Sequence, residues 1–150
     1  MGEPVIGVSR AGAADVADWL AMRDALWPHA AAENPDEIAA LLAAADQAAF
    51  VARGDGDAPL GFAEASIRRD HVNGCETSPV GFLEGIFVVE AARRQGVARQ
   101  LVAAVAEWSR ELGCRELGSD ALLHNEDSHL MHAALGFSET QRVVFFKRLL

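Results

Sequence analysis

Cysteine is scarce in this chain, and its scarcity excludes two ways of stabilising a small protein. Only Cys75 and Cys114 occur among 150 residues, 39 positions apart, and no histidine set at metal-ligand spacing accompanies them. The sequence therefore indicates neither a disulfide framework nor a zinc site. We expect two reduced thiols and no metal, as in a cytoplasmic protein.

Long apolar runs are also missing. No uninterrupted apolar stretch approaches the roughly 18 residues that a membrane-spanning helix needs. The first residues, Met1 to Pro4, lack the basic and apolar regions of a signal peptide. The sequence predicts a cytoplasmic protein without a membrane anchor.

Positive charge is in short supply as well. The chain has 13 Lys and Arg residues against 22 Asp and Glu residues, a net charge of -9. Such a field repels phosphate backbones and anionic membranes and attracts cationic ligands. We therefore expect no nucleic-acid partner and no membrane partner.

The length of 150 residues fits one domain, residues 1–150, large enough to bury its own core. Hydrophobic residues make up 51%, but 29 of them are alanine, so bulky core side chains are fewer than this fraction implies. The composition is that of a globular protein.

Hydrophobic periodicity and turn residues divide the chain into ten elements. Strands are expected at residues 4–8, 48–53, 60–69, 82–89, 116–119 and 143–149. Helices are expected at residues 13–27, 34–45, 97–112 and 126–135. The order β-α-α-β-β-β-α-β-α-β predicts an α/β (α+β) fold, in which helices flank a mixed sheet.

Three details refine this outline. Pro28 is expected to end the first helix. Asn34 and Glu37 are expected to form a capping box at the start of the second helix, whose acids we interpret as a solvated face. Gly113 and Gly136 are expected to close the third and fourth helices.

The segment FVVEAARRQGVARQL, residues 87–101, predicts an anion site. A strand leads through a short basic loop into the start of a helix, where unpaired backbone N–H groups and the positive helix end converge. Gly96 and the small Ala98 let a phosphate approach the main chain, and Arg93, Arg94 and Arg99 add positive charge. An ordinary helix start with exposed arginines is the alternative. A Rossmann site is disfavoured because G-x-G-x-x-G is absent.

The same residues carry a resemblance. Arg93-x-x-Gly96-x-Ala98 after an apolar strand resembles the pyrophosphate-binding motif of the GCN5-related N-acetyltransferases (GNAT). Asn125 and the run His132-Ala-Ala-Leu-Gly-Phe137 are similar to a later helix of that superfamily, which ends in a Gly-Phe pair.

Further segments resemble one branch of the superfamily, the aminoglycoside 6′-N-acetyltransferases. They are GFAEASIR (61–68), VNGC (72–75), FLEGIFV (82–88), GCRE (113–116) and ALGF (134–137). The resemblance extends from Trp27 nearly to the end of the chain.

This resemblance implies a homodimeric enzyme of the GNAT fold that transfers acetyl from acetyl-CoA to the 6′-amine of an aminoglycoside and so confers antibiotic resistance. The residues that it implies for the cofactor are Val88, Arg93, Arg94, Gly96, Val97, Ala98, Arg99 and Asn125. Glu84 and Asp120 would face the amine. The wider superfamily often has a tyrosine acid where this chain has His132, and the chain contains no tyrosine.

The chemistry supports two carboxylates at such a site. A protonated amine must be bound as a cation and must lose a proton before it can attack a thioester, and a carboxylate serves both needs. Glu84 lies on the strand that leads into the basic loop, and Asp120 ends the next strand. A solvated strand residue is the alternative for Glu84, and a helix-cap or turn acid is the alternative for Asp120.

Other polar residues are candidates for substrate contacts. Trp27 and His29 can form the wall of a sugar site, or a core tryptophan and an exposed histidine. His71, Glu76 and His124 are further candidates, for which solvated loop positions are the alternative. His129 and His132 lie three residues apart, but no third ligand accompanies them, so a metal is not expected.

Two further functions stay open from the residues alone. One is acetylation of another amine, such as a polyamine or a protein N-terminus. The other is a non-catalytic module that binds acyl-CoA.

Overall fold

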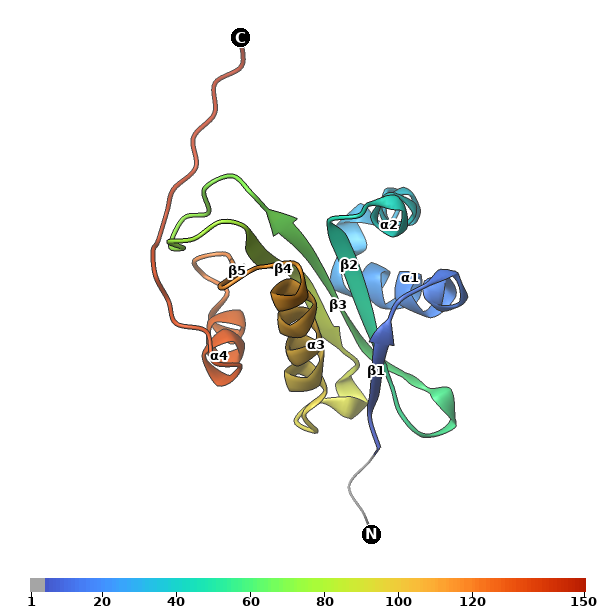
Figure 1. The fold of residues 1–150 in the computed structure, drawn as a ribbon. Helices are drawn as coiled ribbons and strands as arrows, with labels where there is room; N and C mark the ends of the chain where they lie inside the picture. The colour runs from blue at the N-terminus through green and yellow to red at the C-terminus, as the bar shows by residue number, and fades with distance from the viewer. Residues whose placement is uncertain (1–4) are drawn as a thin grey trace.

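The computed structural model describes residues 5–150 and contains a five-stranded mixed sheet (Figure 1). The strands are β1 (Gly7–Arg10), β2 (Gln47–Arg53), β3 (Pro59–Arg68), β4 (Val80–Val88) and β5 (Leu117–Ser119), and they lie in this order. Neighbours from β1 to β4 are antiparallel, whereas β4 and β5 are parallel. The sheet is therefore mixed, as predicted.

Four helices cover the sheet. They are α1 (Val16–Leu26), α2 (Asn34–Ala43), α3 (Val97–Glu111) and α4 (Glu126–Ala134). Helices α1 and α2 lie on one face of the sheet and α3 lies on the other, whereas α4 lies near β5, where His132 contacts Ser119 (Figure 1). Trp19, Ile38 and Phe62 belong to the core under α1 and α2, and Leu101 and Val105 belong to the core under α3.

The elements from the first helix to the fourth confirm the predicted order. Helix α1 ends at Leu26, two residues before Pro28. Strands β2 and β3 form the predicted antiparallel hairpin. Gly113 and Gly136 follow α3 and α4 with φ of 89° and 91°, the left-handed conformation that glycine adopts most easily.

The first strand is shifted from its predicted position. It was expected at residues 4–8, but β1 pairs Gly7 to Arg10 with Arg53 to Phe50 of β2. The bounds of β1 are thus set by the residues of β2 with which it pairs. Pro4 lies outside the described residues.

The predicted strand at residues 143–149 is wrong for the single chain. This segment has no regular secondary structure and extends away from the sheet as a tail (Figure 1). Val144, Phe145 and Phe146 are 74%, 85% and 92% exposed. The β-forming residues are present, but a strand needs a partner, and in this chain the segment does not return to the sheet.

The predicted cap of the second helix is also wrong. Glu33 precedes the helix without a side-chain cap, and Asn34 is its first residue, fully buried. The amide of Asn34 instead accepts a hydrogen bond from Arg23 and donates one to Asp24. A tertiary contact has taken the place of the local cap.

Both cysteines are free thiols, as predicted. Burial raises the pKa of the Cys75 thiol, with a smaller contribution from Glu116, and burial likewise raises the pKa of Cys114. Within residues 5–150, no helix combines the length and apolar character that crossing a bilayer requires.

Candidate active site

A β-bulge in β4 sets the direction of the side chains at the middle of the sheet. On β3, the neighbours Glu64 and Ala65 pair with Gly85 and Leu83, so Glu84 is the extra residue between them. Glu84 lines a pocket on the face that α1 and α2 cover, and Gly85 contacts Trp27 on the same face. The bulge therefore gives this face two consecutive residues of β4.

Gly85 makes room for the Trp27 ring. A Cβ atom at Gly85 would lie 2.4 Å from Cη2 of Trp27, closer than two carbon atoms can approach. The ring also packs edge-on against Phe62 at 6.3 Å between centroids, and the Arg23 guanidinium carbon lies 4.7 Å from its centroid. Trp27 is thus held from three sides.

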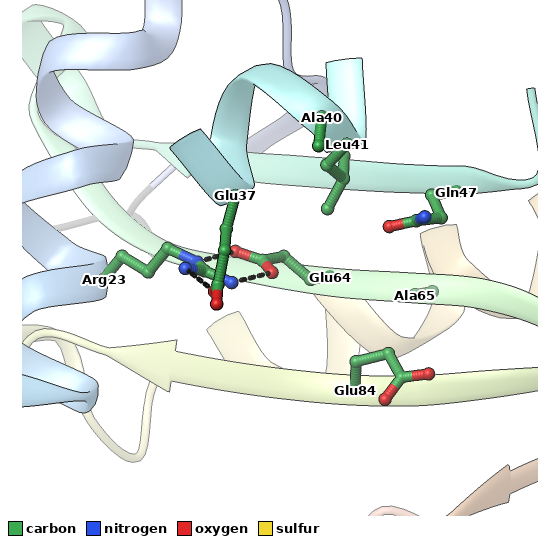
Figure 2. A pocket seen from close by; sticks show the side chains of 8 residues that line it. All are labelled: Arg23, Glu37, Ala40, Leu41, Gln47, Glu64, Ala65 and Glu84. Atoms are coloured by element: carbon green, nitrogen blue, oxygen red, sulfur yellow. Dashed lines mark hydrogen bonds and ion pairs between the residues drawn. The ribbon is translucent and has the colours of Figure 1, made fainter. Parts of the chain in front are cut away.

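Two pockets of about 290 and 330 Å³ open on this face and share several lining residues. Figure 2 shows the first of them. Both are lined by Arg23, Glu37, Glu64 and Glu84, and the second is also lined by Trp27, His29 and Ala30. The structure therefore brings the predicted residues Trp27, His29 and Glu84 together. Three carboxylates against one arginine make these pockets suited to a cation.

A buried ion network forms the floor of the pockets (Figure 2). The Glu64 carboxylate is 2% exposed and accepts from Arg23 Nε at 2.8 Å, Arg23 Nη2 at 3.1 Å and Trp19 Nε1 at 2.9 Å. Arg23 Nη1 donates to Asn34 and to the half-exposed Glu37. Burial opposes the charge of Arg23, but its bonds to Glu64 and Glu37 raise the pKa of the guanidinium.

Sequence reasoning missed this network. Arg23 occurs in the apolar stripe of the first helix, and a charged residue on a buried face is the signal that could have revealed it. The partner Glu64 lies 41 positions away, which no local pattern links to Arg23. Our interpretation of Glu37 as a solvated acid is incomplete, since it lines both pockets and pairs with Arg23.

The Glu84 carboxylate is already paired within the protein. Its Oε1 accepts from Ser66 Oγ at 2.6 Å and from Arg68 Nη2 at 2.8 Å, with Arg68 Nε at 3.3 Å. Its Oε2 accepts from Arg68 Nη2 at 3.0 Å. Glu84 and Arg68 are both partly exposed, so the pair borders on water.

Asp120 lies at the end of β5, next to the strand that carries Glu84. Ser119 pairs with Leu83, so Asp120 and Glu84 each follow one residue of the same pair. Asp120 is exposed and is not among the residues that line the two pockets. The two predicted acids therefore lie at the same level of the sheet, but only Glu84 lines the pockets, whereas Asp120 is exposed outside them.

His132 of α4 is held near the end of β5 by contacts with Ser119, Ser128 and Phe137. Its Nε2 lies 2.7 Å from Ser119 Oγ, and its Nδ1 lies 2.7 Å from the Ser128 carbonyl oxygen. The ring packs edge-on against Phe137 at 5.3 Å. The Ser128 carbonyl favours a proton on Nδ1, and Nε2 faces the Ser119 hydroxyl, which also donates to the Leu83 carbonyl at 3.3 Å.

The basic loop has the geometry of an anion site. Gly96 precedes α3 with φ of 84°, and a Cβ there would meet no atom within 4 Å. Arg94 also has a positive φ of 65°, and Arg93 Nε donates to the carbonyl of Val88 at 3.2 Å. The loop thus presents the start of a 15-residue helix to open space.

Side chains around this loop divide into core and surface. Val97 is buried in the core under α3, so only its backbone can face a ligand. Ala98 and Val88 are half-buried, whereas Arg93, Arg94 and Arg99 are exposed. Positive charge is therefore concentrated beside the helix start.

The remaining candidates lie elsewhere. His71, Glu76 and His124 are exposed and do not line the two pockets. Asn125 caps α4 by accepting from Ser128 N at 3.2 Å, a structural use of its amide oxygen.

Glu116 organises the loop that contains Glu76. It accepts from the Thr77 hydroxyl, from Thr77 N at 2.6 Å and from Glu76 N at 2.9 Å. These hydrogen bonds lower the pKa of the Glu116 carboxyl, and the bond from the Thr77 hydroxyl contributes most.

Comparison with known proteins bears on this arrangement. The model of the acetyltransferase (GNAT) family matches residues 15–137. An aminoglycoside N(6′)-acetyltransferase type 1 from Serratia marcescens is 53% identical over 133 residues, which cover 88% of this chain and 91% of that protein. A protein of the same name from Salmonella typhimurium is 49% identical over 135 residues, covering 87% and 90%.

Solved structures of aminoglycoside acetyltransferases have the same fold as this chain. The aminoglycoside antibiotic 6′-N-acetyltransferase AAC(6′)-Ih from Acinetobacter baumannii superposes with a TM-score of 0.94 at 42% identity, covering 97% of this chain and 99% of that chain. AAC(6′)-Iy in complex with the bisubstrate analogue CoA-S-monomethyl-acetylneamine gives 0.92 at 43% identity, with the same coverage.

Proposed function

Because the chain belongs to the acetyltransferase (GNAT) family, we propose that it transfers the acetyl group of acetyl-CoA to the 6′-amine of an aminoglycoside. The observation that carries this function is the similarity to aminoglycoside N(6′)-acetyltransferases over nearly the whole chain. The acidic pockets beside Glu84 support a polycationic acceptor.

The loop before α3 is the proposed site of the CoA pyrophosphate. The backbone N–H groups of Gly96, Val97, Ala98 and Arg99 would bind its oxygens at the positive helix end. Arg93 and Arg94 would add charge from the loop. Four strand residues, from Gly85 to Val88, separate Glu84 at the acidic pockets from this loop, a span of about 13 Å along β4.

Glu84 and Asp120 are the groups that we assign to the reacting amine. The amine arrives mainly as an ammonium ion, and the Glu84 carboxylate at the pocket binds it. The ammonium ion must lose one proton to become a nucleophilic amine, and a carboxylate or a water molecule beside it accepts that proton. The amine nitrogen then forms a bond to the acetyl carbon as the carbon–sulfur bond of the thioester breaks; CoA leaves as a thiolate, and the second proton that the nitrogen gives up converts it to the CoA thiol.

Trp27 and His29 would form the wall against which the sugar rings lie. The Trp27 ring is held rigidly by Gly85, Phe62 and Arg23, which makes it a preformed apolar surface. His71 and Asn125 stay candidates, for substrate and cofactor respectively.

A free-thiol release assay tests this proposal. Acetyl-CoA is supplied with kanamycin, tobramycin, spermidine or a peptide, and kcat/KM is compared among the amines and among wild type, E84Q and D120N. E107Q, which removes the same charge from the exposed side of α3, is the matched control. We expect a preference for aminoglycosides, and a lower kcat/KM in E84Q and D120N but not in E107Q.

Each other outcome has a defined meaning. Equal rates with spermidine reject the aminoglycoside as preferred acceptor. Absence of turnover with every amine, together with acetyl-CoA binding, indicates a non-catalytic acyl-CoA module. Unchanged constants in E84Q and D120N reject the roles of these residues but not the reaction.

We further propose that the enzyme is a homodimer in which the tail covers apolar surface between two copies. Residues 143–146 form a β-prone apolar run that is exposed in the single chain. Sedimentation at micromolar concentration is expected to give a dimer, and F145S/F146S is expected to dissociate it. A strict monomer in wild type excludes the proposal.

A cytoplasmic location and a role in resistance complete the proposal. Acetyl-CoA is an intracellular metabolite, which supports the location. Acetylation turns an ammonium group into a neutral amide, so the antibiotic loses one positive charge. Expression in a susceptible bacterium is expected to raise the inhibitory concentration of kanamycin, and E84Q is expected to raise it less.

A further inference from the structure

The carboxylate proposed to bind the amine is shared with an arginine. Arg68 Nη2 reaches both oxygens of Glu84, at 2.8 and 3.0 Å, and Ser66 Oγ donates to Oε1 at 2.6 Å. Arg68 Nε also donates to Oε1, at 3.3 Å, so Oε1 has three donors in all, whereas Oε2 has one. Within the described residues, Oε2 is the oxygen with room for a further donor.

Arg68 is fixed in place independently of Glu84. Its guanidinium carbon lies 3.5 Å from the centroid of the Phe82 ring, a close cation–π contact. The register explains this, since Ser66 pairs with Phe82 and Arg68 pairs with Val80 on β4. Phe82 is itself buried, so Arg68 rests on a rigid surface.

The other charges around Glu84 do not replace Arg68. Arg23 and Glu64 form a buried pair with each other, Glu37 also binds Arg23, and His29 lines the second pocket. Arg68 is therefore the cation that acts directly on the Glu84 carboxylate.

We propose that Arg68 is a positioning residue that pairs with the Glu84 carboxylate. The pairing leaves Oε2 to bind the acceptor ammonium, and it keeps the carboxylate from holding the ammonium proton too firmly. This inference rests on the proposed function of Glu84. It adds that the pair, and not the carboxylate alone, sets the balance between acceptor binding and acceptor deprotonation.

The physical reason is a conflict between two demands on the carboxylate. A lone carboxylate stabilises an adjacent ammonium ion, which improves binding but raises the pKa of the amine. The reaction needs the neutral amine, so the ammonium proton must leave to a carboxylate oxygen or water and then to solvent. A fixed guanidinium on the same carboxylate weakens the hold on that proton and also weakens binding.

The expected signature is a joint fall of two kinetic constants. In R68Q both oxygens of Glu84 lose their bonds to Arg68, and only Ser66 still donates to Oε1, so the carboxylate binds the ammonium more strongly and KM for kanamycin should fall several-fold. The bound amine should be deprotonated less often, so kcat should fall about tenfold at neutral pH, for a change of about one unit in the pKa of the amine. The rise of kcat with pH should move about one unit higher. Such a pattern marks excess stabilisation of the ground state.

The experiment compares five variants, R68Q, R68K, R69Q, E84Q and R68Q/E84Q, with wild type by thiol release across pH. R68K keeps the charge and should stay near wild type in its pH profile. R69Q removes the same charge from the next residue, whose side chain influences Cys114 instead of Glu84, and should change nothing. R68Q in the E84Q background should add no effect to E84Q alone, since Arg68 acts through Glu84. Thermal unfolding of each variant checks that it is folded.

The outcomes separate the inference from the function on which it rests. Wild type that does not acetylate aminoglycosides overturns the proposed function. With an active wild type, R68Q that raises KM, or that behaves as R69Q does, overturns the role of Arg68 alone. An additive effect of R68Q in the E84Q background also overturns it.

Discussion

Replacing Glu64 by glutamine tests whether the ion network under the pockets is needed for the fold. The Glu64 carboxylate is 2% exposed and accepts three hydrogen bonds, two of them from Arg23, whose side chain is 8% exposed. E64Q keeps the shape but removes the charge, which leaves the Arg23 guanidinium buried with only Glu37 as a charged partner.

The expected loss of stability is large. Removing one member of a buried ion pair costs about 3–5 kcal/mol because the other charge stays out of water. Because Arg23 keeps its contact with Glu37, we expect E64Q to lower the free energy of unfolding by about 3 kcal/mol, the lower end of this range. For a chain of this size, 1 kcal/mol shifts the melting temperature by about 2–4 °C, so E64Q should melt about 6–12 °C below wild type.

Urea unfolding and thermal melting at one fixed protein concentration measure this effect. E107Q breaks an exposed pair with Arg110 at 3.5 Å and should cost less than about 0.5 kcal/mol. R23M/E64L removes both charges and should recover much of the stability lost in E64Q. A cost of E64Q below about 1 kcal/mol, or a double variant less stable than E64Q, would refute the reasoning.

Three further outcomes are expected. G96D places a side chain and a negative charge at the loop before α3, so calorimetry should show acetyl-CoA binding weakened by at least tenfold; wild-type affinity would exclude this loop as the phosphate site. G85A sets a Cβ 2.4 Å from the Trp27 ring, so Trp27 fluorescence and KM for kanamycin should change, and identical spectra would contradict the packing described here. The lowered pKa of Glu116 means that its contribution to stability is present above its ordinary pKa and is lost as pH falls through the folded value; stability should therefore drop below about pH 4 more in wild type than in E116Q, and parallel acid curves would contradict this.

Local patterns were sufficient to predict most of the fold. The apolar spacing in α1 and α3, Pro28 and the closing glycines act through a few neighbouring residues, so the sequence displays them directly. The hairpin of β2 and β3 follows from the turn residues between two β-prone runs.

Features that depend on distant partners escaped prediction. Asn34 has the residue type of a helix cap, but Arg23 and Asp24 bind its amide in the folded chain. Residues 143–149 have the composition of a strand, but that composition does not say which strand, or which copy of the chain, would pair with them.

The candidate site was predicted in part for the same reason. Gly96 and its basic loop are contiguous in sequence, and Glu84 follows from its position on the strand before them. The ions that surround Glu84 come from other elements: Arg68 from β3, Arg23 from α1 and Glu37 from α2. Their convergence is a property of the packed chain.

The bulge at Glu84 has a consequence for how insertions and deletions would act on this protein. Leu83 and Gly85 pair with adjacent residues of β3, so the ladder between β3 and β4 is complete without Glu84. Deleting Glu84 would leave a regular strand with both cores in register and would remove only this carboxylate from the pocket, where Glu37 and Glu64 remain. Deleting Leu83 instead would also remove the extra residue, but Glu84 would then take its place opposite Ala65 and turn its carboxylate toward the core under α3. The acid is thus carried by a residue that the ladder does not need, so loss of that single codon would remove the carboxylate proposed to bind the amine and leave the strand pairing in place.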